Sequence, residues 1–344
     1  MYGSCKTMGL INDNAVKNIS DKNILSEIDS KKIELQKERQ KFFDQRTAFN
    51  KVVRERSRQE ELNEILTEAI NNGNLPIFTP TLSPTWVYDD NDLLVSLNDI
   101  HYGMVADNYW NTYNSDVCKE YFEEYLNRVL QIAETHGSEN CIVWMGGDAI
   151  SGNIHASIQV ANKENVIEQV VGVSELISTF LAELAKYFNK VGFVSVAGNH
   201  SRITQNKDDA IMQERLDDLI EWYLKARLQN FENVTIGCGE KIDCSMFVVN
   251  IKGKNYVGVH GDYDGSAAKI QSLNSMVDEK IYAVLMGHLH HNKVDEVQGI
   301  KTIMAGSFIG MDDFCVKKRI YGKPEQLVCV CDENGVRCFY DIPL

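Results

Sequence analysis

Two histidines separated by a single residue, His288 and His290, follow a short apolar segment that spans residues 281–286. The segment has the length and composition of a buried β-strand, and Gly287 allows the backbone to turn sharply where that strand ends. Neutral imidazole is the commonest metal-binding side chain, and two rings at this spacing on a loop can face one point. Because neighbouring histidines are more often exposed or hydrogen-bonded than metal-bound, a metal site requires further ligands from elsewhere in the chain.

Four other segments also place polar residues where a predicted strand ends. The carboxyl ends of strands line one edge of an α/β sheet, and functional sites are built at that edge. Six of the eight histidines of the chain lie in or beside these segments, whereas random placement would scatter them over helices and linkers. The pattern therefore indicates one site assembled from five strand ends. The polar residues at the four further ends are Asp99 and His101, Asp148, Asn199 and His200, and His260.

The chemistry of this set points to divalent cations. Asp, His and one Asn without a thiolate suit borderline or hard ions such as manganese, iron or zinc. There are too many ligands for one tetrahedral ion, so a carboxylate that bridges two ions fits better. Centres with two ions ~3.5–4 Å apart hydrolyse phosphate esters, because the ions neutralise the phosphoryl oxygens and bound water loses its proton near neutral pH. We therefore expect two divalent metal ions, with manganese as the expected ion and iron or zinc as alternatives.

The elements that must position these residues fall in the second part of the chain. Predicted strands at 93–98, 141–145 and 191–196 alternate with amphipathic helices, and strands then dominate from residue 233 to a final hairpin at Asn334-Gly335. This order predicts a layered α/β domain in which helices cover a sheet or a pair of sheets. The predicted helices span 115–135, 164–189 and 208–228.

The first part of the chain has a different composition. Residues 20–69 contain no Gly or Pro and are rich in Lys, Glu, Gln and Arg, which predicts a long helix. Apolar residues recur every seven positions among mostly polar ones, and this favours a helix that lies on its own domain or on a partner over a free coiled coil. We expect residues 1–84 to form a helical arm with a Pro-containing linker, and residues 85–344 to form the catalytic domain. The recurring residues are Ile28, Leu35, Phe42 and Phe49.

The charge and the cysteine content limit which binding partners and which cellular compartment are expected. The net charge is −14, yet residues 31–58 carry ten basic and four acidic side chains. Such asymmetry is typical of a basic arm on an acidic body, although a solvated, salt-bridged helix is the interpretation that we favour. Nine scattered cysteines without a C-x-x-C pair argue against a disulfide framework and indicate the cytoplasm. We expect no membrane association, because no segment has the apolar length of a membrane span and the first residues do not form a secretory signal.

The motifs in their order along the chain closely resemble those of the calcineurin-like metallophosphoesterase superfamily over about residues 90–310. The resemblance implies a two-sheet β-sandwich flanked by helices, and it implies a role for each motif residue. His200 would be the histidine that is not a ligand and that protonates the leaving oxygen, as a general acid. The first metal would be bound by Asp99, His101, Asp148 and His290, and the second by Asp148 as the bridge with Asn199, His260 and His288. The motifs are Asp99-x-His101, Gly147-Asp148, Gly198-Asn199-His200, His260-Gly261 and Gly287-His288-x-His290.

Two further residues are candidates for contact with the substrate. His155 follows Asp148 on a segment that could overhang the site, which makes it a candidate for contact with the substrate. Arg202 follows the Gly198-Asn199-His200 motif and is placed to meet a phosphate, although most arginines on loops are only solvated.

The form of the first motif, Asp99-x-His101-x-Gly103, is most similar to that of repair nucleases such as the nuclease subunit of the SbcCD complex. The chain as a whole resembles phage and prophage phosphoesterases of the DNA repair exonuclease type. Two features depart from that branch. Ser201 stands where an acidic residue commonly follows the histidine, and no separate DNA-capping domain follows the last hairpin.

Three functions therefore stay open. The first is a DNA nuclease, exonuclease-like, in which a hydroxide that bridges the metals attacks the phosphodiester and His200 acts as the general acid. The second is a phosphatase or cyclic-nucleotide phosphodiesterase with a small-molecule or protein substrate, which the acidic body favours. The third is an interaction protein or homo-oligomer that assembles through the N-terminal helix. Buried unpaired Asp and His side chains would cost stability in the absence of a metal, which argues against the third.

Overall fold

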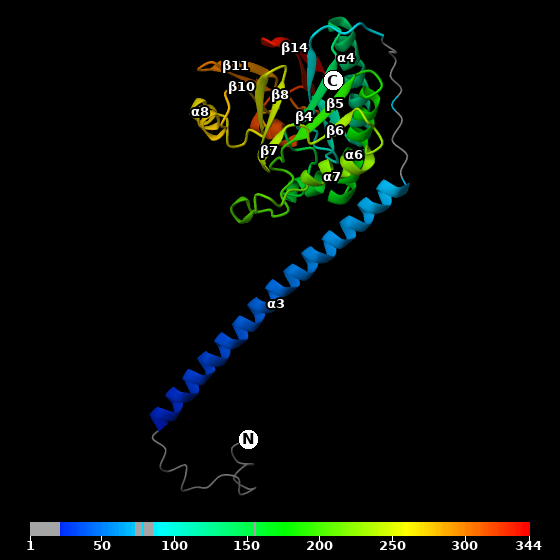
Figure 1. Ribbon diagram of the computed structural model, residues 1–344. Helices are drawn as coiled ribbons and strands as arrows, with labels where there is room; N and C mark the ends of the chain where they lie inside the picture. The colour runs from blue at the N-terminus through cyan, green and yellow to red at the C-terminus, as the bar shows by residue number, and fades with distance from the viewer. Residues whose placement is uncertain (1–20, 73–77, 79–84, 155) are drawn as a thin grey trace. The chain divides into compact units, whose positions relative to one another are not determined.

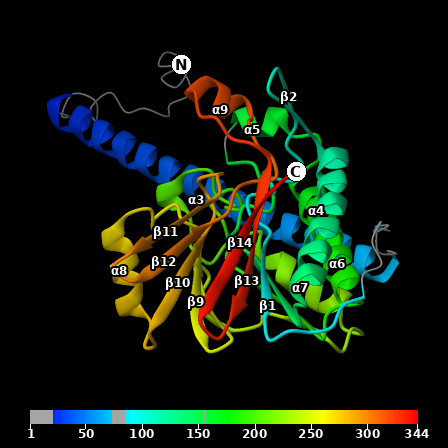
Figure 2. The same ribbon diagram turned by 90° about the horizontal axis from the view of Figure 1, so that it is seen from above.

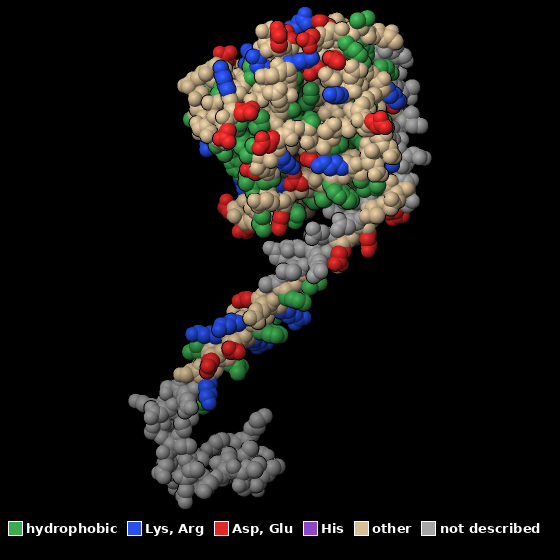
Figure 3. All heavy atoms as spheres, viewed as in Figure 1, with side chains coloured by type: hydrophobic (Ala, Val, Ile, Leu, Met, Phe, Trp, Pro, Cys, Tyr) green, Lys and Arg blue, Asp and Glu red, His purple; other side chains and the backbone are tan. Residues whose placement is uncertain are grey.

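The computed structural model describes residues 21–72, 78, 85–154 and 156–344, and the chain divides into two compact units, Met1–Glu64 and Ile65–Leu344. The predicted long helix is present as α3 (Asp21–Asn72), drawn in blue in Figure 1. Apolar and charged side chains alternate along the described stretch of this helix (Figure 3), and Leu35, Phe42 and Phe49 are 64–72% exposed. The predicted Pro-containing linker lies almost wholly outside the described residues.

The first six-stranded sheet has the order β14-β13-β1-β4-β5-β6. Strands β1, β4, β5 and β6 run parallel, and β13 and β14 are antiparallel to their neighbours. The parallel strands end at the same edge, which is the requirement for the predicted site. Their bounds are β1 (Asp92–Ser96), β4 (Asn140–Met145), β5 (Lys190–Ser195), β6 (Val234–Ile236), β13 (Glu325–Asp332) and β14 (Gly335–Pro343).

Three helices connect the parallel strands and lie on one face of this sheet (Figure 1). Asn114 caps the first of them by accepting hydrogen bonds from the backbone N–H groups of Asp116 and Val117, and Gly137 ends it in a left-handed conformation. Asn165 and Glu168 form a capping box at the start of the second. The helices are α4 (Ser115–His136), α6 (Val166–Leu184) and α7 (Asp218–Arg227).

The second six-stranded sheet has the order β11-β12-β10-β9-β8-β7, and Figure 2 shows it beside the first. In this sheet β10 runs parallel to both β9 and β12. Helix α8 (Ala267–Met276) packs Ile270 and Leu273 against its outer face. The strands are β7 (Glu240–Asp243), β8 (Met246–Ile251), β9 (Lys254–Val259), β10 (Ile281–Met286), β11 (Lys293–Val297) and β12 (Ile300–Met304).

A hydrophobic core fills the space between the two sheets. Leu94 and Trp144 of the first sheet belong to the same buried cluster as Phe247, Tyr256 and Leu285 of the second. Burial of apolar surface is the dominant favourable contribution to folding, so this cluster holds the two sheets together. The predicted fold class, a two-sheet β-sandwich flanked by helices with an N-terminal helix, is confirmed.

The fold departs from the predicted elements in one place that matters for the site. The sequence predicts a helix over 208–228, whereas α7 begins only at Asp218, and the 3-10 turn η1 (Lys207–Asp209) and irregular backbone precede it. Asp217, directly before α7, uses its carboxylate to bind backbone elsewhere in the domain. Tertiary hydrogen bonds of this kind override the helical pattern of the local sequence.

Four short elements complete the domain: the hairpin of β2 (Ala106–Asn108) and β3 (Asn111–Tyr113), α5 (Ala156–Ala161) and α9 (Asp313–Lys318). Among the described helices, none combines the length and the apolar character that crossing a bilayer requires.

Phe247 in the core provides a test of the sheet-to-sheet packing. It is fully buried and pairs with Gly258, where a Cβ atom would lie only 2.0 Å from the Phe247 ring. We expect Phe247→Ala to lower the free energy of unfolding by about 3–5 kcal/mol, because it leaves a cavity between the sheets. Phe339→Ala, at a side chain of β14 that is 51% exposed, is the matched control and should change it by no more than about 0.5 kcal/mol. Equal effects in chemical denaturation would contradict the assignment of this core.

Candidate metal centre

The eight predicted motif residues converge at the carboxyl ends of five strands. Those after β1, β4 and β5 come from the first sheet, and those after β9 and β10 come from the second. Three overlapping groups of Asp and His ligand atoms form there, and within each group the atoms lie within 4.8 Å of one another. The groups are Asp99, His101 and His290; His101, Asp148 and His200; and Asp148, His260 and His288.

The backbone at the site is strained. Five of the eight non-glycine residues with positive φ in the described part of the chain are motif residues. A left-handed conformation costs a non-glycine residue about 1–2 kcal/mol, and such strain persists only where surrounding contacts enforce it. Here backbone hydrogen bonds join the first two motifs, from Asp99 N to Gly147 O (3.2 Å) and from His101 N to Asp148 O (3.0 Å). The five are Asp99, His101, Asp148, His288 and His290, with φ between 50° and 67°.

The first cluster contains three groups whose lone pairs face one another. Nε2 of His290 lies 3.2 Å from Nε2 of His101 and 3.3 Å from Oδ1 of Asp99. This Asp99 oxygen is buried and accepts no hydrogen bond from the residues that the structure describes. Burial lowers the pKa of His290, but the charge of Asp99 outweighs it and the net shift is upward. Burial and the neighbouring histidines His200 and His290 hold the pKa of His101 well below its ordinary value. One cation among the three groups would satisfy all of them.

The second cluster is arranged around His260. Its Nδ1 donates to the carbonyl oxygen of Gly146 at 2.7 Å, so Nε2 carries the lone pair when the ring is neutral. That nitrogen lies 3.1 Å from Oδ1 of Asn199, 3.2 Å from Nδ1 of His288 and 3.3 Å from Oδ2 of Asp148. Four acceptor atoms therefore meet at one point, which requires either a proton or a metal ion between them. These oxygen and nitrogen atoms are suitable ligands for a divalent cation.

Asp148 belongs to both parts of the site. It is 1% exposed, its Oδ2 faces His260, and its Oδ1 accepts a hydrogen bond from the backbone N–H of His200 at 2.7 Å. Burial raises the pKa of Asp148, but the surrounding histidines outweigh it and hold that pKa well below its ordinary value. A carboxylate that stays ionised between two donor clusters is suited to bridge two cations.

His200 differs from the other histidines in its surroundings. Its Nδ1 donates to the carbonyl oxygen of Ser151 at 2.9 Å, which fixes the orientation of the ring. This hydrogen bond does not involve Nε2, the other ring nitrogen. The ring stands edge-on to His101, with 4.5 Å between the centroids. This geometry places a partly buried imidazole at the rim of the first cluster.

Three buried polar residues that were not singled out from the sequence form hydrogen bonds with the backbone of the motif loops. Oδ2 of Asp217 accepts hydrogen bonds from the backbone N–H groups of Asp148 (3.0 Å) and Gly198 (2.9 Å). Asn98 accepts from Gly146 N, and Gln326 forms two hydrogen bonds with the backbone of Asn98. Gln326 could have been found as a polar residue in an otherwise apolar strand, but no signal in the sequence distinguishes Asp217 from its polar neighbours.

Of the two candidate substrate contacts, the structure describes only Arg202. His155 lies outside the described residues. Arg202 is 6% exposed, and its Nη2 donates to the carbonyl oxygen of Gln205 at 3.4 Å while its Nε has no partner among the described groups. Its contact with substrate stays a prediction.

Both parts of the chain are similar to known sequences. A family model described as the YonJ coiled-coil domain matches residues 31–73, within α3 and just beyond it. The chain is 24% identical over 306 residues to the SPbeta prophage-derived uncharacterized protein YonJ of Bacillus subtilis, and the alignment covers 85% of this chain and 74% of that protein. The match thus reaches well beyond the helix into the two-sheet domain.

Solved structures are similar at low levels of identity. Zinc-complexed Vps29 from Entamoeba histolytica is 11% identical and has a TM-score of 0.34, with 72% of this chain and 91% of that chain covered. A novel archaeal phosphodiesterase is 12% identical and has a TM-score of 0.35, with 73% and 99% covered.

Asp217 gives a first prediction for the site. Asp217→Ala leaves two buried N–H groups without an acceptor, so we expect affinity for Mn²⁺ to fall about 10–100-fold, the usual effect of losing a group that orients ligands. Asp217→Asn keeps an acceptor oxygen and should restore most of the affinity. Asp208→Ala, at an exposed residue of the same loop, is the control. Isothermal titration calorimetry tests this, and equal affinities for all three variants would contradict the role.

His260 gives a second prediction, on pH. Burial lowers its pKa, but the charge of Asp148 outweighs burial, so the pKa is raised to about 10. The resulting stabilisation of the metal-free protein is complete below the unfolded value of about 6.5 and is lost as pH rises through the raised value.

A cation at Nε2 must displace this proton, so binding of Mn²⁺ near pH 7 should release protons and tighten as pH rises. Calorimetry in two buffers of different ionisation enthalpy measures the number released. Zero released protons, or the same number in His260→Asn, would argue against His260 as a ligand.

Proposed function

We propose that this protein is a dinuclear-metal-dependent phosphoesterase that hydrolyses phosphodiesters, with DNA as its substrate. The observation that carries the proposal is the position of Asp148 between two clusters of acceptor atoms that fit two cations. Two divalent cations, when bound, supply the positive charge that neutralises phosphoryl oxygens and lowers the pKa of the attacking water.

In this proposal the chain provides the ligands and fixes their orientation. Asp99, His101 and His290 would bind one cation, Asn199, His260 and His288 the other, and Asp148 both. The hydrogen bond from His260 Nδ1 to Gly146 O supports the assignment, because it presents Nε2 to the cation. Manganese is the expected ion, with iron or zinc as alternatives.

His200 is proposed as the general acid. Since its Nδ1 proton is donated to Ser151 O, protonation of Nε2 would give an imidazolium whose free N–H can be directed at a leaving oxygen. The ring can donate from Nδ1 to Ser151 and from a protonated Nε2 to the leaving oxygen at the same time. The carbonyl oxygen of Ser151 can only accept, so it keeps the proton on Nδ1.

Three observations support nucleic acid as the substrate class. The first motif has the form of repair nucleases, and the relative that aligns with 85% of this chain is prophage-derived. In addition, all six basic side chains described between residues 31 and 46 of α3 are exposed, and none of them is in an ion pair within the described part of the chain. These exposed charges are available to phosphates.

The proposal is tested by adding Mn²⁺ to chelator-treated protein. We expect hydrolysis of bis-p-nitrophenyl phosphate and of DNA to require the metal. His200→Ala should lower kcat for the diester about 10²–10⁴-fold and leave Mn²⁺ affinity near the wild-type value, whereas Asp148→Asn should lose both metal affinity and turnover.

His291→Ala is the matched control, because that exposed ring bonds only to Leu289 O among the described groups. Undiminished hydrolysis by both site variants would overturn the assignment. Turnover of p-nitrophenyl phosphate without any diester or DNA cleavage would instead assign a phosphatase, the class that the net charge of −14 favours.

A further inference from the structure

A second basic segment, besides the one in α3, lies in the two-sheet domain. Residues 314–323 contain four exposed Lys or Arg side chains and no acidic residue, in a protein of net charge −14. None of the four is in an ion pair with any residue that the structure describes, although Asp312, Asp313 and Glu325 flank the segment in the sequence. They are Lys317, Lys318, Arg319 and Lys323.

Exposed aromatic rings accompany these charges. Phe314 is 58% and Tyr321 69% exposed, and Lys318 Nζ lies 5.9 Å from the centre of the Phe314 ring. At the tip of the β2–β3 hairpin, Tyr109 is 92% and Trp110 52% exposed. Large aromatic side chains are normally buried, so four exposed rings in one region require an explanation.

The hairpin and the basic segment are held side by side. Asn108 and Asn111 of the hairpin each donate to the carbonyl oxygen of Met311, at 3.2 and 3.1 Å. Met311 lies two residues before α9, and Figure 2 shows β2 and α9 near each other on the domain. The hairpin tip that carries Tyr109 and Trp110 is therefore fixed against the segment that leads into α9. We call the hairpin tip, together with the exposed basic and aromatic residues of 314–323, the basic–aromatic surface.

The chain around α9 passes close to the candidate metal centre twice, once before the helix and once after it. Phe308 N donates to the carbonyl oxygen of Asp99 at 3.1 Å, where the chain leaves the site toward α9. Arg319 then takes a left-handed conformation that ends α9 and turns the chain back. A Cβ atom on Gly322 would lie 3.5 Å from the carbonyl oxygen of His290, so the returning backbone passes beside a proposed ligand.

We propose that the basic–aromatic surface binds a single-stranded nucleic acid and leads it to the metal centre, an inference that rests on the proposed function. Lys and Arg side chains neutralise backbone phosphates, and exposed aromatic rings stack on unpaired bases irrespective of sequence. Base pairing in a duplex would hide the faces that these rings need. Basic and aromatic residues also occur together at membrane surfaces, but the proximity to His290 favours a substrate role.

The test measures binding of a fluorescent single-stranded oligonucleotide to the full-length protein in chelator, which prevents cleavage. The triple variant K317A/K318A/R319A should bind about tenfold or more weakly at moderate salt. The slope of log K against log salt should become less steep by about 0.7 for each phosphate that the variant no longer neutralises. Tyr109→Ala combined with Trp110→Ala should weaken binding about fivefold or more for each base that stacks, with the salt slope unchanged.

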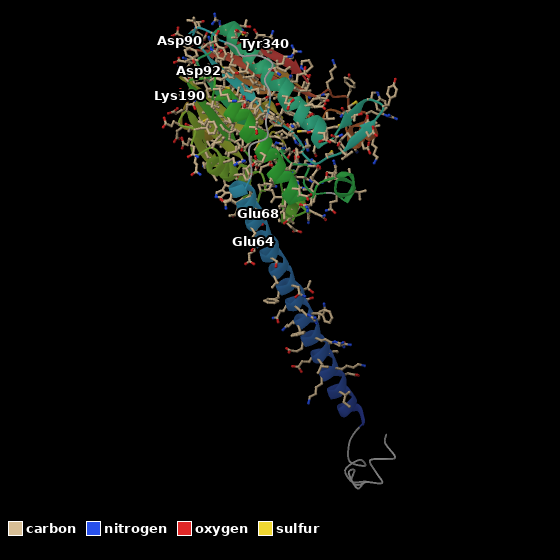
Figure 4. The ribbon with its side chains drawn as sticks, turned by 90° about the vertical axis from the view of Figure 1, so that its right-hand side faces the viewer. Glu64, Glu68, Asp90, Asp92, Lys190 and Tyr340 are labelled. Carbon is tan, nitrogen blue, oxygen red and sulfur yellow. The ribbon has the colours of Figure 1, made fainter. Side chains whose placement is uncertain are left out.

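The matched control removes three lysines from the opposite end of the domain. Lys190, Lys254 and Lys280 lie at or just before the amino ends of β5, β9 and β10, and Figure 4 shows Lys190 near Asp90 and Asp92 at the start of β1. K190A/K254A/K280A changes the net charge equally and should leave affinity and slope close to wild type. Circular dichroism and Mn²⁺ binding verify that each variant is folded.

Equal weakening by the two triple variants would overturn the proposal, because it would reduce the effect to net charge. Binding of anionic phosphatidylserine vesicles that K317A/K318A/R319A abolishes, without any change in oligonucleotide affinity, would also overturn it and assign a membrane surface. The proposed function fails separately, if the wild-type protein with Mn²⁺ hydrolyses no phosphodiester. Hydrolysis of bis-p-nitrophenyl phosphate without any oligonucleotide binding would reject this surface alone.

Discussion

The need of buried carboxylate and imidazole groups for a proton or a cation between them is the constraint on which the rest of this structure depends. Carboxylate oxygens of Asp99 and Asp148 lie against imidazole nitrogens of His290 and His260 with few donors between them. Bringing such groups out of water is costly unless protons or cations lie between them. The fold tolerates this arrangement because a large core between the sheets and a set of buried hydrogen bonds hold the strand ends in place.

Much of the fold and nearly all of the proposed ligand set were accessible from the sequence. The reason is physical: each motif directly follows an apolar run such as 281–286, and parallel strands bring their carboxyl ends to one edge. The long α3 was equally accessible, because it lacks Gly and Pro over fifty residues. Strand β11, with the sequence KVDEV, could not be predicted as a separate strand, since its mostly polar residues give no alternating pattern.

The supporting hydrogen bonds could not be predicted in the same way. Asp217 lies seventeen positions after His200 in a polar loop, and only the folded chain places its carboxylate against the N–H groups of Asp148 and Gly198. The same interaction explains why the helix predicted from residue 208 starts ten residues later. The basic–aromatic surface was equally hidden, because the sequence separates its hairpin from its basic segment by about two hundred residues. In the folded chain, Asn108 and Asn111 bind the backbone just before α9.

Each proposed cation site draws ligands from both sheets: Asp99 and His101 with His290, and Asp148 and Asn199 with His260 and His288. A bound ion would therefore act as a cross-link between two layers that are otherwise joined mainly by apolar packing. Because ligand binding to the native state alone raises stability with the logarithm of free ligand concentration, the resistance of this domain to unfolding would follow the supply of metal. Its lifetime in a cell would then vary with the availability of the ion, even where no substrate is present.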